Sequence, residues 1–296
     1  IFQIISFMKY ITSFAIFLLT TVIVVAQVKL EPPGRSNPNF FPTIKSLEGA
    51  WVVTAVEKDD IGSSSRWMSE WYIKGSNMVA NYKGVGLAET TMNKNWQVRS
   101  FQNNGDRITF QIVQSYWGSS TTLDIEITEF KEPVFRGHYV KRMNVGGISL
   151  NYRGAIELRC IMPFYPDPQI KDKLVGSWLN QGQQSFETLG GPTGYSIRAN
   201  LFKDNNWLMM KFDGKDQDGI PIATTWFIIY AKQTGNKLRM TAYAPQGSCV
   251  NAGCGSVIDY ELQWTASNKL SGAFSGVNAS SYLILGTNGS LEFLRR

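Results

Sequence analysis

Apolar and polar residues alternate with a period of two through most of the chain. Residues 123–127 (LDIEI) and 258–262 (IDYEL) show the alternation most strictly. This period is typical of a β-strand that buries one face. Short stretches of this kind recur between Asn-Gly and Gly-Gly turns, and neither half of the chain contains a three-turn amphipathic helical pattern. The pattern predicts an all-β chain that forms sandwiches or closed barrels.

An internal repeat divides the chain into two domains. Five segments recur in the same order: residues 47–51 with 174–178, 96–108 with 226–238, 123–127 with 258–262, 135–137 with 274–276, and 154–158 with 289–293. A conserved order from end to end favours tandem duplication over coincidence. We therefore predict two antiparallel β domains, at 46–161 and 173–296, joined by a linker at 162–172.

The N-terminus has the order of a secretory signal peptide, which we place at 1–26. Lys9 precedes an apolar stretch at 11–25, and Val24 and Ala26 supply the small residues required before a cleavage site. An uncleaved membrane anchor is the alternative interpretation, because the apolar stretch approaches a membrane-spanning length. We predict a secreted, extracellular chain with no stable membrane insertion after cleavage.

Two further features complete this N-terminal region. Met8 is the expected start, so residues 1–7 would lie upstream of it, and the Pro- and Gly-rich residues 27–45 form an extended linker.

The composition indicates a folded chain, because 43% of its residues are hydrophobic and 13% are aromatic. The 29 basic and 23 acidic residues give a net charge of +6 without a basic run, which argues against a nucleic-acid partner.

The start of each domain resembles the calycin group, which includes lipocalins, fatty-acid-binding proteins and avidins. The resemblance rests on a Gly-x-Trp sequence in the first strand, a following meander and a late basic residue. It implies two tandem antiparallel β-barrels of the calycin type, each closed at one end by a tryptophan beneath an arginine. The matching pairs are Trp51 with Arg159 and Trp178 with Arg295. Residues 174–180 also resemble an avidin opening, but no biotin site is carried over.

The usual catalytic and metal-binding patterns are weak in this sequence. His138 is the single histidine, and its place in a strand favours a surface position over a catalytic one. Residues 213–219 are rich in aspartate, but their spacing fails as an EF-hand calcium loop. We therefore name no catalytic residue, no metal site and no cofactor, and we leave enzymatic activity undecided.

Tryptophan residues are the most conspicuous candidates for ligand binding. If a barrel has a lumen, Trp71, Trp96, Trp207 and Trp226 are the candidates to line it and hold an apolar or aromatic ligand. The leading hypothesis is a secreted, non-enzymatic carrier of a small hydrophobic or aromatic molecule. The alternatives are a structural protein of a shell or skeletal extracellular matrix, with matrix components as partners, and a cofactor-free oxygenase of the luciferase type.

Secretion makes two covalent modifications relevant. Cys249 and Cys254 enclose a short loop, and an oxidising compartment favours a disulfide between them. Cys160 is then the odd cysteine, either a buried thiol or a site of intermolecular pairing. Asn278 and Asn288 begin glycosylation sequons, and we place both in turns near the C-terminus.

Overall fold

The computed structural model describes nine stretches of the chain, which are residues 47–84, 94–116, 118–131, 133–161, 168–187, 189–213, 224–245, 255–279 and 284–296. The predicted signal peptide, the N-terminal linker and the Cys249–Cys254 loop lie outside them. None of the helices in these stretches is long and apolar enough to cross a membrane.

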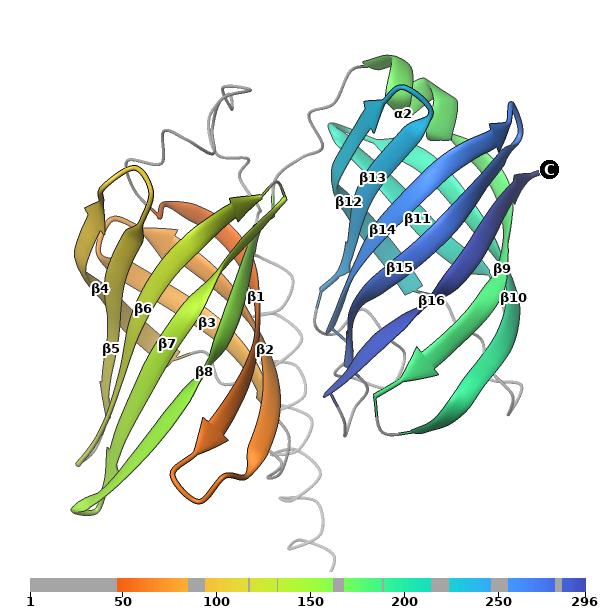
Figure 1. Ribbon diagram of the computed structural model, residues 1–296. Helices are drawn as coiled ribbons and strands as arrows, with labels where there is room; N and C mark the ends of the chain where they lie inside the picture. Colours follow the sequence, from red (N-terminus) through yellow and green to blue (C-terminus); the bar gives the residue numbers. More distant parts are fainter. Residues whose placement is uncertain are drawn as a thin grey trace, which may run out of the picture. The chain divides into compact units, whose positions relative to one another are not determined.

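The first half of the chain forms a closed, eight-stranded antiparallel barrel, called barrel 1. Each strand pairs with the next in sequence, and the last pairs with the first (Figure 1). Its strands are β1 (Gly49–Asp59), β2 (Ser64–Lys74), β3 (Asn77–Gly84), β4 (Lys94–Asn103), β5 (Ile108–Tyr116), β6 (Ser119–Lys131), β7 (Val134–Val145) and β8 (Ile148–Cys160).

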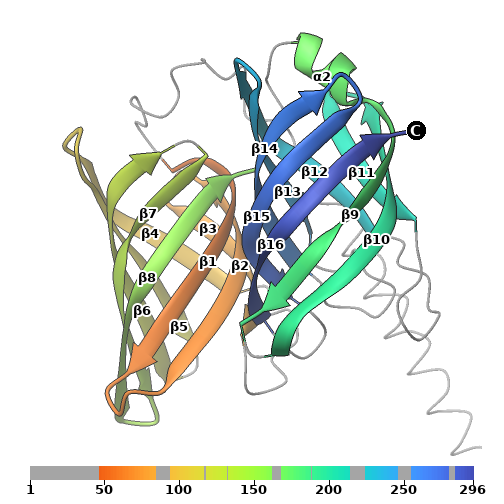
Figure 2. The ribbon, with the colours of Figure 1, turned by 45° about the vertical axis from the view of Figure 1, so that its right-hand side comes forward.

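The second half forms another closed, eight-stranded barrel, called barrel 2. Its strands are β9 (Gly176–Phe186), β10 (Leu189–Asp204), β11 (Trp207–Asp213), β12 (Thr224–Thr234), β13 (Lys237–Ala244), β14 (Gly255–Ala266), β15 (Lys269–Ala279) and β16 (Ile284–Arg295). In both views the strands wrap around each barrel at a tilt (Figures 1 and 2). The predicted fold class, all-β with two tandem antiparallel barrels, is confirmed.

Alternation along the strands decides which side chains fill each barrel. In β1, Trp51, Val53 and Ala55 point inward and are almost fully buried, as the period of two predicts. Both barrels contain one apolar cluster of this kind, with Trp51 and Trp178 among its largest fully buried members. Closure of the sheet leaves no unpaired edge strand in either barrel, which removes a route to aggregation.

The same indole contact marks the start of both barrels. Trp51 Nε1 donates to the Leu47 carbonyl at 2.9 Å, and Trp178 Nε1 donates to the Leu174 carbonyl at 2.8 Å. Leu174 ends the helix α2 (Pro168–Leu174), whose Ile170 is also buried in the barrel 2 core. The sequence predicts only a linker at 162–172, whereas a helix occupies its end because proline suits a first helical turn.

Cys160 is a free thiol in the core of barrel 1. Burial raises its pKa to about 12, so the thiol stays protonated and unreactive near neutral pH. Its side chain packs at the end of β8, opposite Trp51 on β1. Of the two expectations for this cysteine, the folded structure therefore supports the buried thiol over intermolecular pairing.

Candidate functional site

At one end of barrel 1, which we call its open end, described residues at inward-facing positions are exposed to solvent. This end is formed by the β1–β2 and β7–β8 turns, which lie at the lower end of this barrel in Figure 1. Val145, Ile148 and Leu150 continue the inward-facing positions of β7 and β8, yet their exposed fractions are 47%, 65% and 41%. Inward-facing residues toward the other end, such as Ile156 and Leu158, are almost fully buried. Apolar side chains at inward-facing positions of β7 and β8 are therefore exposed to solvent at this end.

A buried carboxylate lies inside barrel 1, toward the open end. Glu57 follows Trp51, Val53 and Ala55 on the inward face of β1 and is only 4% exposed. Its Oε2 accepts hydrogen bonds from Tyr139 OH at 2.5 Å and from Trp67 Nε1 at 3.1 Å. Because both donors are themselves buried, the carboxylate is held in one position inside the barrel.

Lys141 neutralises this carboxylate. Its Nζ lies 2.6 Å from Glu57 Oε1 and 2.8 Å from Oε2, and its side chain is 12% exposed. The same ammonium lies 4.2 Å from the centroid of the Tyr152 ring, a cation–π distance. Burial, followed by the charges of Glu57 and Asp59, raises the pKa of Tyr152, so its phenol stays protonated. We call Glu57, Trp67, Tyr139, Lys141 and Tyr152 the polar cluster of barrel 1.

A glycine makes room for this arrangement. Gly154 on β8 pairs with Tyr139 on β7, and both residues face inward. A Cβ at Gly154 would lie 2.1 Å from the Val56 carbonyl oxygen and 3.0 Å from Tyr139 Cε1. The absent side chain therefore allows β8 to approach β1 closely and the Tyr139 ring to lie across it, where its hydroxyl reaches Glu57.

Stability alone does not account for a buried ion pair in this place. Removing two charges from water costs several kcal/mol per ion, and well-packed apolar residues often stabilise a fold as much or more. The pair also lies near the exposed inward-facing positions of the open end. A charge-paired polar cluster under an apolar entrance instead resembles a small-molecule pocket, in which a few polar groups orient a mainly apolar ligand.

Barrel 2 has uncharged residues at the corresponding positions. Gln184 follows Trp178 by six residues, as Glu57 follows Trp51, and its Nε2 donates to Thr287 Oγ1 at 2.9 Å. In the strand pairing of barrel 2, Tyr195 occupies the position that Trp67 occupies in barrel 1. Its hydroxyl donates to Asn180 Oδ1 at 3.3 Å. Both barrels therefore contain a layer of polar side chains. Among the described residues, the ion pair in this layer occurs in barrel 1.

The four tryptophans predicted to line a lumen lie in different environments. Trp71 is buried in the barrel 1 core, and Trp96 packs against that core while partly exposed. Trp226 is buried in barrel 2, where its Nε1 has no hydrogen-bond partner in the structure. The prediction that Trp207 lines a lumen is wrong. Its neighbour Leu208 faces inward, so Trp207 faces outward, where its ring contacts Phe227 at a centroid distance of 5.1 Å.

The predicted barrel-closing pairs also differ. The Arg295 guanidinium lies 4.9 Å from the Trp178 ring centroid and donates to the Val175 carbonyl at 2.8 Å. Arg159 does not lie over Trp51, and this assignment is corrected. The strand pairing places Cys160 opposite Trp51, so Arg159, one residue earlier, faces out of the barrel and pairs with Asp259 at 2.6 Å.

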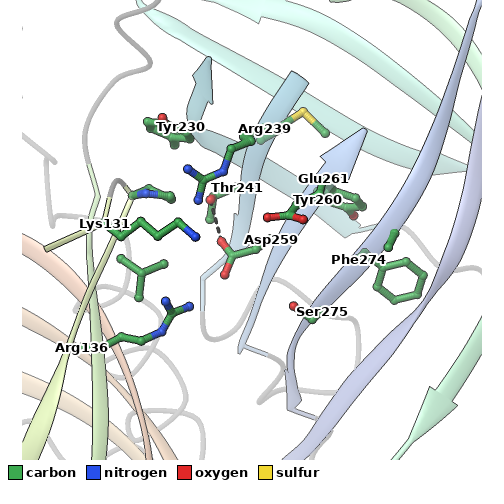
Figure 3. A pocket seen from close by; sticks show the side chains of 14 residues that line it. Lys131, Arg136, Tyr230, Arg239, Thr241, Asp259, Tyr260, Glu261, Phe274 and Ser275 are labelled. Atoms are coloured by element: carbon green, nitrogen blue, oxygen red, sulfur yellow. Dashed lines mark hydrogen bonds between the residues drawn. The ribbon is translucent and has the colours of Figure 1, made fainter. Parts of the chain in front are cut away.

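Two further hollows are lined by both polar and apolar groups. A groove of about 680 Å³ is lined by residues of β4 to β8, among them the exposed His138. A smaller pocket of about 190 Å³ contains Lys131 and Arg136 of barrel 1 with Arg239, Thr241 and Asp259 of barrel 2 (Figure 3). In it, Thr241 Oγ1 donates to Asp259 at 2.7 Å.

Within the described stretches, no group of three or more His, Cys, Asp or Glu side chains is placed to hold a metal ion. The polar cluster of barrel 1 was not among the predicted site residues. Its one signal in the sequence is that Glu57 interrupts the run of inward-facing apolar residues after Trp51. Its partners Tyr139 and Lys141 lie more than 80 residues away, and only barrel closure brings them together.

Comparisons with known proteins return distant structural similarity. No family model matches the chain, and no curated protein sequence matches it. A protein of unknown function from Nostoc punctiforme is 11% identical, over 84% of this chain and 96% of that chain, with a TM-score of 0.26. Kievitone hydratase from Nectria haematococca is 10% identical, over 90% of this chain and 94% of that chain, with a TM-score of 0.23.

A third structure, transferrin-binding protein B from Haemophilus parasuis, is 8% identical. The match covers 85% of this chain and 77% of that chain, with a TM-score of 0.23. At these identities and TM-scores, we transfer no property of the three proteins to this chain. The function is argued below from the residues of the chain itself.

Proposed function

We propose that this chain is a binding protein in which barrel 1 takes up a small, mainly apolar molecule through its open end. The observation that carries the proposal is the exposure of the inward-facing residues Val145, Ile148 and Leu150 near buried charged groups of the barrel interior. Apolar side chains that face a barrel interior and remain in contact with water offer surface that a ligand can cover.

The polar cluster supports a ligand with one polar group. Lys141 has three N–H donors, and its ion pair with Glu57 leaves donor capacity toward the open end, where its side chain is partly exposed. An acceptor group of the ligand would interact with Lys141, while the apolar body would contact Leu150 and the ring of Tyr152. Glu57 would keep the lysine in place before and after the ligand binds.

Cellular context enters the proposal from the sequence. The signal-peptide pattern at 1–26, the expected Cys249–Cys254 disulfide and the glycosylation sequons together favour a secreted, extracellular carrier of the calycin type. The carrier would be non-enzymatic, with a small apolar or aromatic molecule as its partner. A role in an extracellular matrix is the alternative that gains if ligand binding is not found.

The test uses anilinonaphthalene sulfonate, a fluorescent probe with an apolar body and one anionic group. We expect saturable binding, quenching of intrinsic tryptophan fluorescence and a rise in the melting temperature, since a ligand of the folded state stabilises it. Leu150→Asp places a charge in the open end and should weaken binding at least about tenfold. The matched control is Val79→Asp, because Val79 is also exposed, at 39%, but faces outward on β3.

Two results would contradict the proposal. One is equal affinity of the two aspartate variants for the probe, which would place binding outside the open end of barrel 1. The other is the absence of any bound small molecule in native mass spectra of protein from its source, together with no melting shift across an apolar panel. The second result would favour the matrix alternative.

A further inference from the structure

A separate hollow of about 500 Å³ lies in barrel 2, at the end where α2 packs. It is lined by the β12–β13 and β14–β15 hairpins, the last turn of α2 and the end of β16. Figure 1 shows this end of barrel 2 uppermost, beside α2. The side chains of Lys173, Gln233, Trp264 and Arg295 give the hollow its chemical character, and the polar cluster of barrel 1 contributes nothing to its lining.

Two buried polar atoms in the wall of this hollow lack partners. Gln233 and Trp264 occupy inward-facing positions of β12 and β14. Gln233 Nε2 donates to the Gly235 carbonyl at 2.8 Å, whereas Gln233 Oε1 and Trp264 Nε1 have no hydrogen-bond partner in the described part of the chain. Such atoms are unfavourable in a folded protein unless a water molecule or a ligand completes them. One acceptor and one donor are therefore available to a molecule bound in the hollow.

The charge of the hollow is basic, and ion pairs do not cancel it. Lys173 and Arg295 belong to its lining, which contains no acidic side chain. Their acidic neighbours along the chain, Asp172 and Glu292, pair with other lysines. Among the residues that the structure describes, Lys173 and Arg295 have no carboxylate partner. An anion bound in the hollow would therefore meet two uncompensated cations.

Arg295 is held in one position before any ligand binds. Its guanidinium lies 4.9 Å from the centroid of the Trp178 ring, and Nη2 donates to the carbonyls of Lys173 at 2.5 Å and Val175 at 2.8 Å. These bonds use the two N–H groups of Nη2, so Nε and Nη1 retain three donors. Backbone carbonyls leave the positive charge in place. Arg295 is thus a preorganised group for binding an anion.

We propose that this hollow binds a small carboxylate that also carries a hydroxyl group, as in a hydroxy acid or an acidic sugar. The carboxylate would accept hydrogen bonds from Arg295 and Lys173, because a guanidinium group matches the geometry of a carboxylate. Trp264 Nε1 requires an acceptor and Gln233 Oε1 requires a donor, and a hydroxyl group supplies both. A neutral sugar would leave the two cations without a partner, and a simple carboxylate would leave Gln233 Oε1 without a donor.

This inference goes beyond the proposed function and does not rest on it, because it concerns barrel 2 and a polar ligand. Uptake of an apolar molecule by barrel 1 is tested with variants of the open end, and the hollow with variants of its own lining. Either can therefore fail while the other holds.

The experiment is titration calorimetry of the full chain with two probes, lactate and glucuronate. Acetate and glucose are the matched compounds, since acetate lacks a hydroxyl group and glucose lacks a carboxylate. We expect at least one probe to bind about tenfold or more tightly than either matched compound, because each of these loses one set of interactions. Binding should weaken with added salt. Binding of lactate alone would identify a hydroxy acid, and binding of glucuronate alone an acidic sugar.

Two variants assign the binding to the hollow. Trp264→Phe keeps an aromatic ring and removes the N–H donor, and Lys173→Gln removes a charge at an exposed position. Each should weaken binding about fivefold or more. Trp226→Phe is the control for the first, because it removes another buried, unpartnered N–H group of barrel 2 outside the hollow. Lys237→Gln is the control for the second, because Lys237 is exposed and does not line the hollow. Both controls should bind like the unmodified chain.

Three results would overturn the proposal. One is the failure of both probes to bind more tightly than acetate, which would indicate an adventitious ion only. Another is displacement of the probes by equal concentrations of phosphate, which would identify a site for any anion. The third is equal affinity of each variant and its control. Lys173→Gln should keep the melting temperature of Lys237→Gln, so its loss of binding does not reflect unfolding.

Discussion

Asn278 and Asn288 begin the same type of acceptor sequence but lie on opposite faces of barrel 2. Asn278 is paired with Ser256, whose hydroxyl donates to Asn278 Oδ1 at 3.1 Å on the inward side. Asn288 is exposed and lies between Thr287, which is buried, and Gly289 in the middle of β16. The expectation that both lie in turns is corrected, since both belong to strands. Only Asn288 has room for a glycan.

Secreted protein should therefore carry a glycan on Asn288 and none on Asn278. A glycan at the inward Asn278 would displace the Ser256 contact and block the barrel interior, so folded material would exclude it. Intact mass before and after N-glycosidase treatment measures this. Asn288→Gln should abolish the mass change, and Asn278→Gln should leave it intact. A glycopeptide that contains modified Asn278 in folded, secreted protein would refute this prediction, as would an unchanged mass of the unmodified chain.

At the level of strands, inward-facing glycines set how closely neighbouring strands approach. At six of them a Cβ would lie only 1.9–2.1 Å from a backbone oxygen of the adjacent strand, and these are Gly137, Gly154, Gly182, Gly272, Gly276 and Gly289. Such positions allow sharp coiling of the sheet, which closure of a small barrel requires. The sequence placed Asn288 in a turn, but its neighbour Gly289 lies within β16 and allows this close approach to Gln183.

Gly154→Ala should destabilise the chain by about 1–3 kcal/mol, because a methyl group forces β8 away from Val56 and displaces the Tyr139 ring. Gly191→Ala is the control, since Gly191 lies in β10 with no neighbouring atom within 4 Å of its Cβ position. Its effect should stay within about 0.5 kcal/mol. Urea unfolding followed by circular dichroism measures both. Equal stability of the two variants would show that the close approach at Gly154 relaxes without cost.

The sequence predicted the strands and their duplication well because both are local properties. A period of two and a repeated order of motifs are visible without knowing which residues meet. The side of the sheet on which a single residue lies was harder to predict, since a shift of one position along the strand reverses it. Arg159 illustrates this, because its neighbour Cys160 occupies the position opposite Trp51. The contact of Glu57 with Lys141 joins residues 84 positions apart, which no local pattern reveals.

On the scale of the whole molecule, charged residues of the two barrels contact one another. Arg159 of barrel 1 is 3% exposed in its side chain and lies 2.6 Å from Asp259 of barrel 2. The same guanidinium lies 2.7 Å from Glu157, which also accepts Arg136 Nε at 2.7 Å. A buried arginine needs such partners, because loss of one would leave its charge uncompensated.

The titration of Glu157 makes this network sensitive to acid. Burial alone would raise the pKa of its carboxyl group, but the charges and hydrogen bonds of Arg159 and Arg136 outweigh burial and lower it. A carboxyl group whose pKa is lower in the folded state than in the unfolded chain stabilises the fold at neutral pH. This stabilisation is complete above the ordinary glutamate pKa of 4.5 and disappears as the pH falls through the lower folded value.

Glu157→Gln should therefore reduce the free energy of unfolding at pH 7 and not in strong acid. We expect a difference on the order of 1 kcal/mol at neutral pH, because the carboxylate is partly exposed and screened by solvent. As the pH falls below the lowered pKa of the folded state, the difference should shrink toward zero, since the native glutamate is then protonated in both states. Glu129→Gln is the matched control: Glu129 contacts the same Arg136 at 3.4 Å but is more exposed, so its substitution should have little effect at either pH. Thermal and urea unfolding between pH 3 and pH 7 measure these differences. A Glu157→Gln deficit that stays constant with pH would assign the loss to packing, and the ionic role of Glu157 between the two arginines would be rejected.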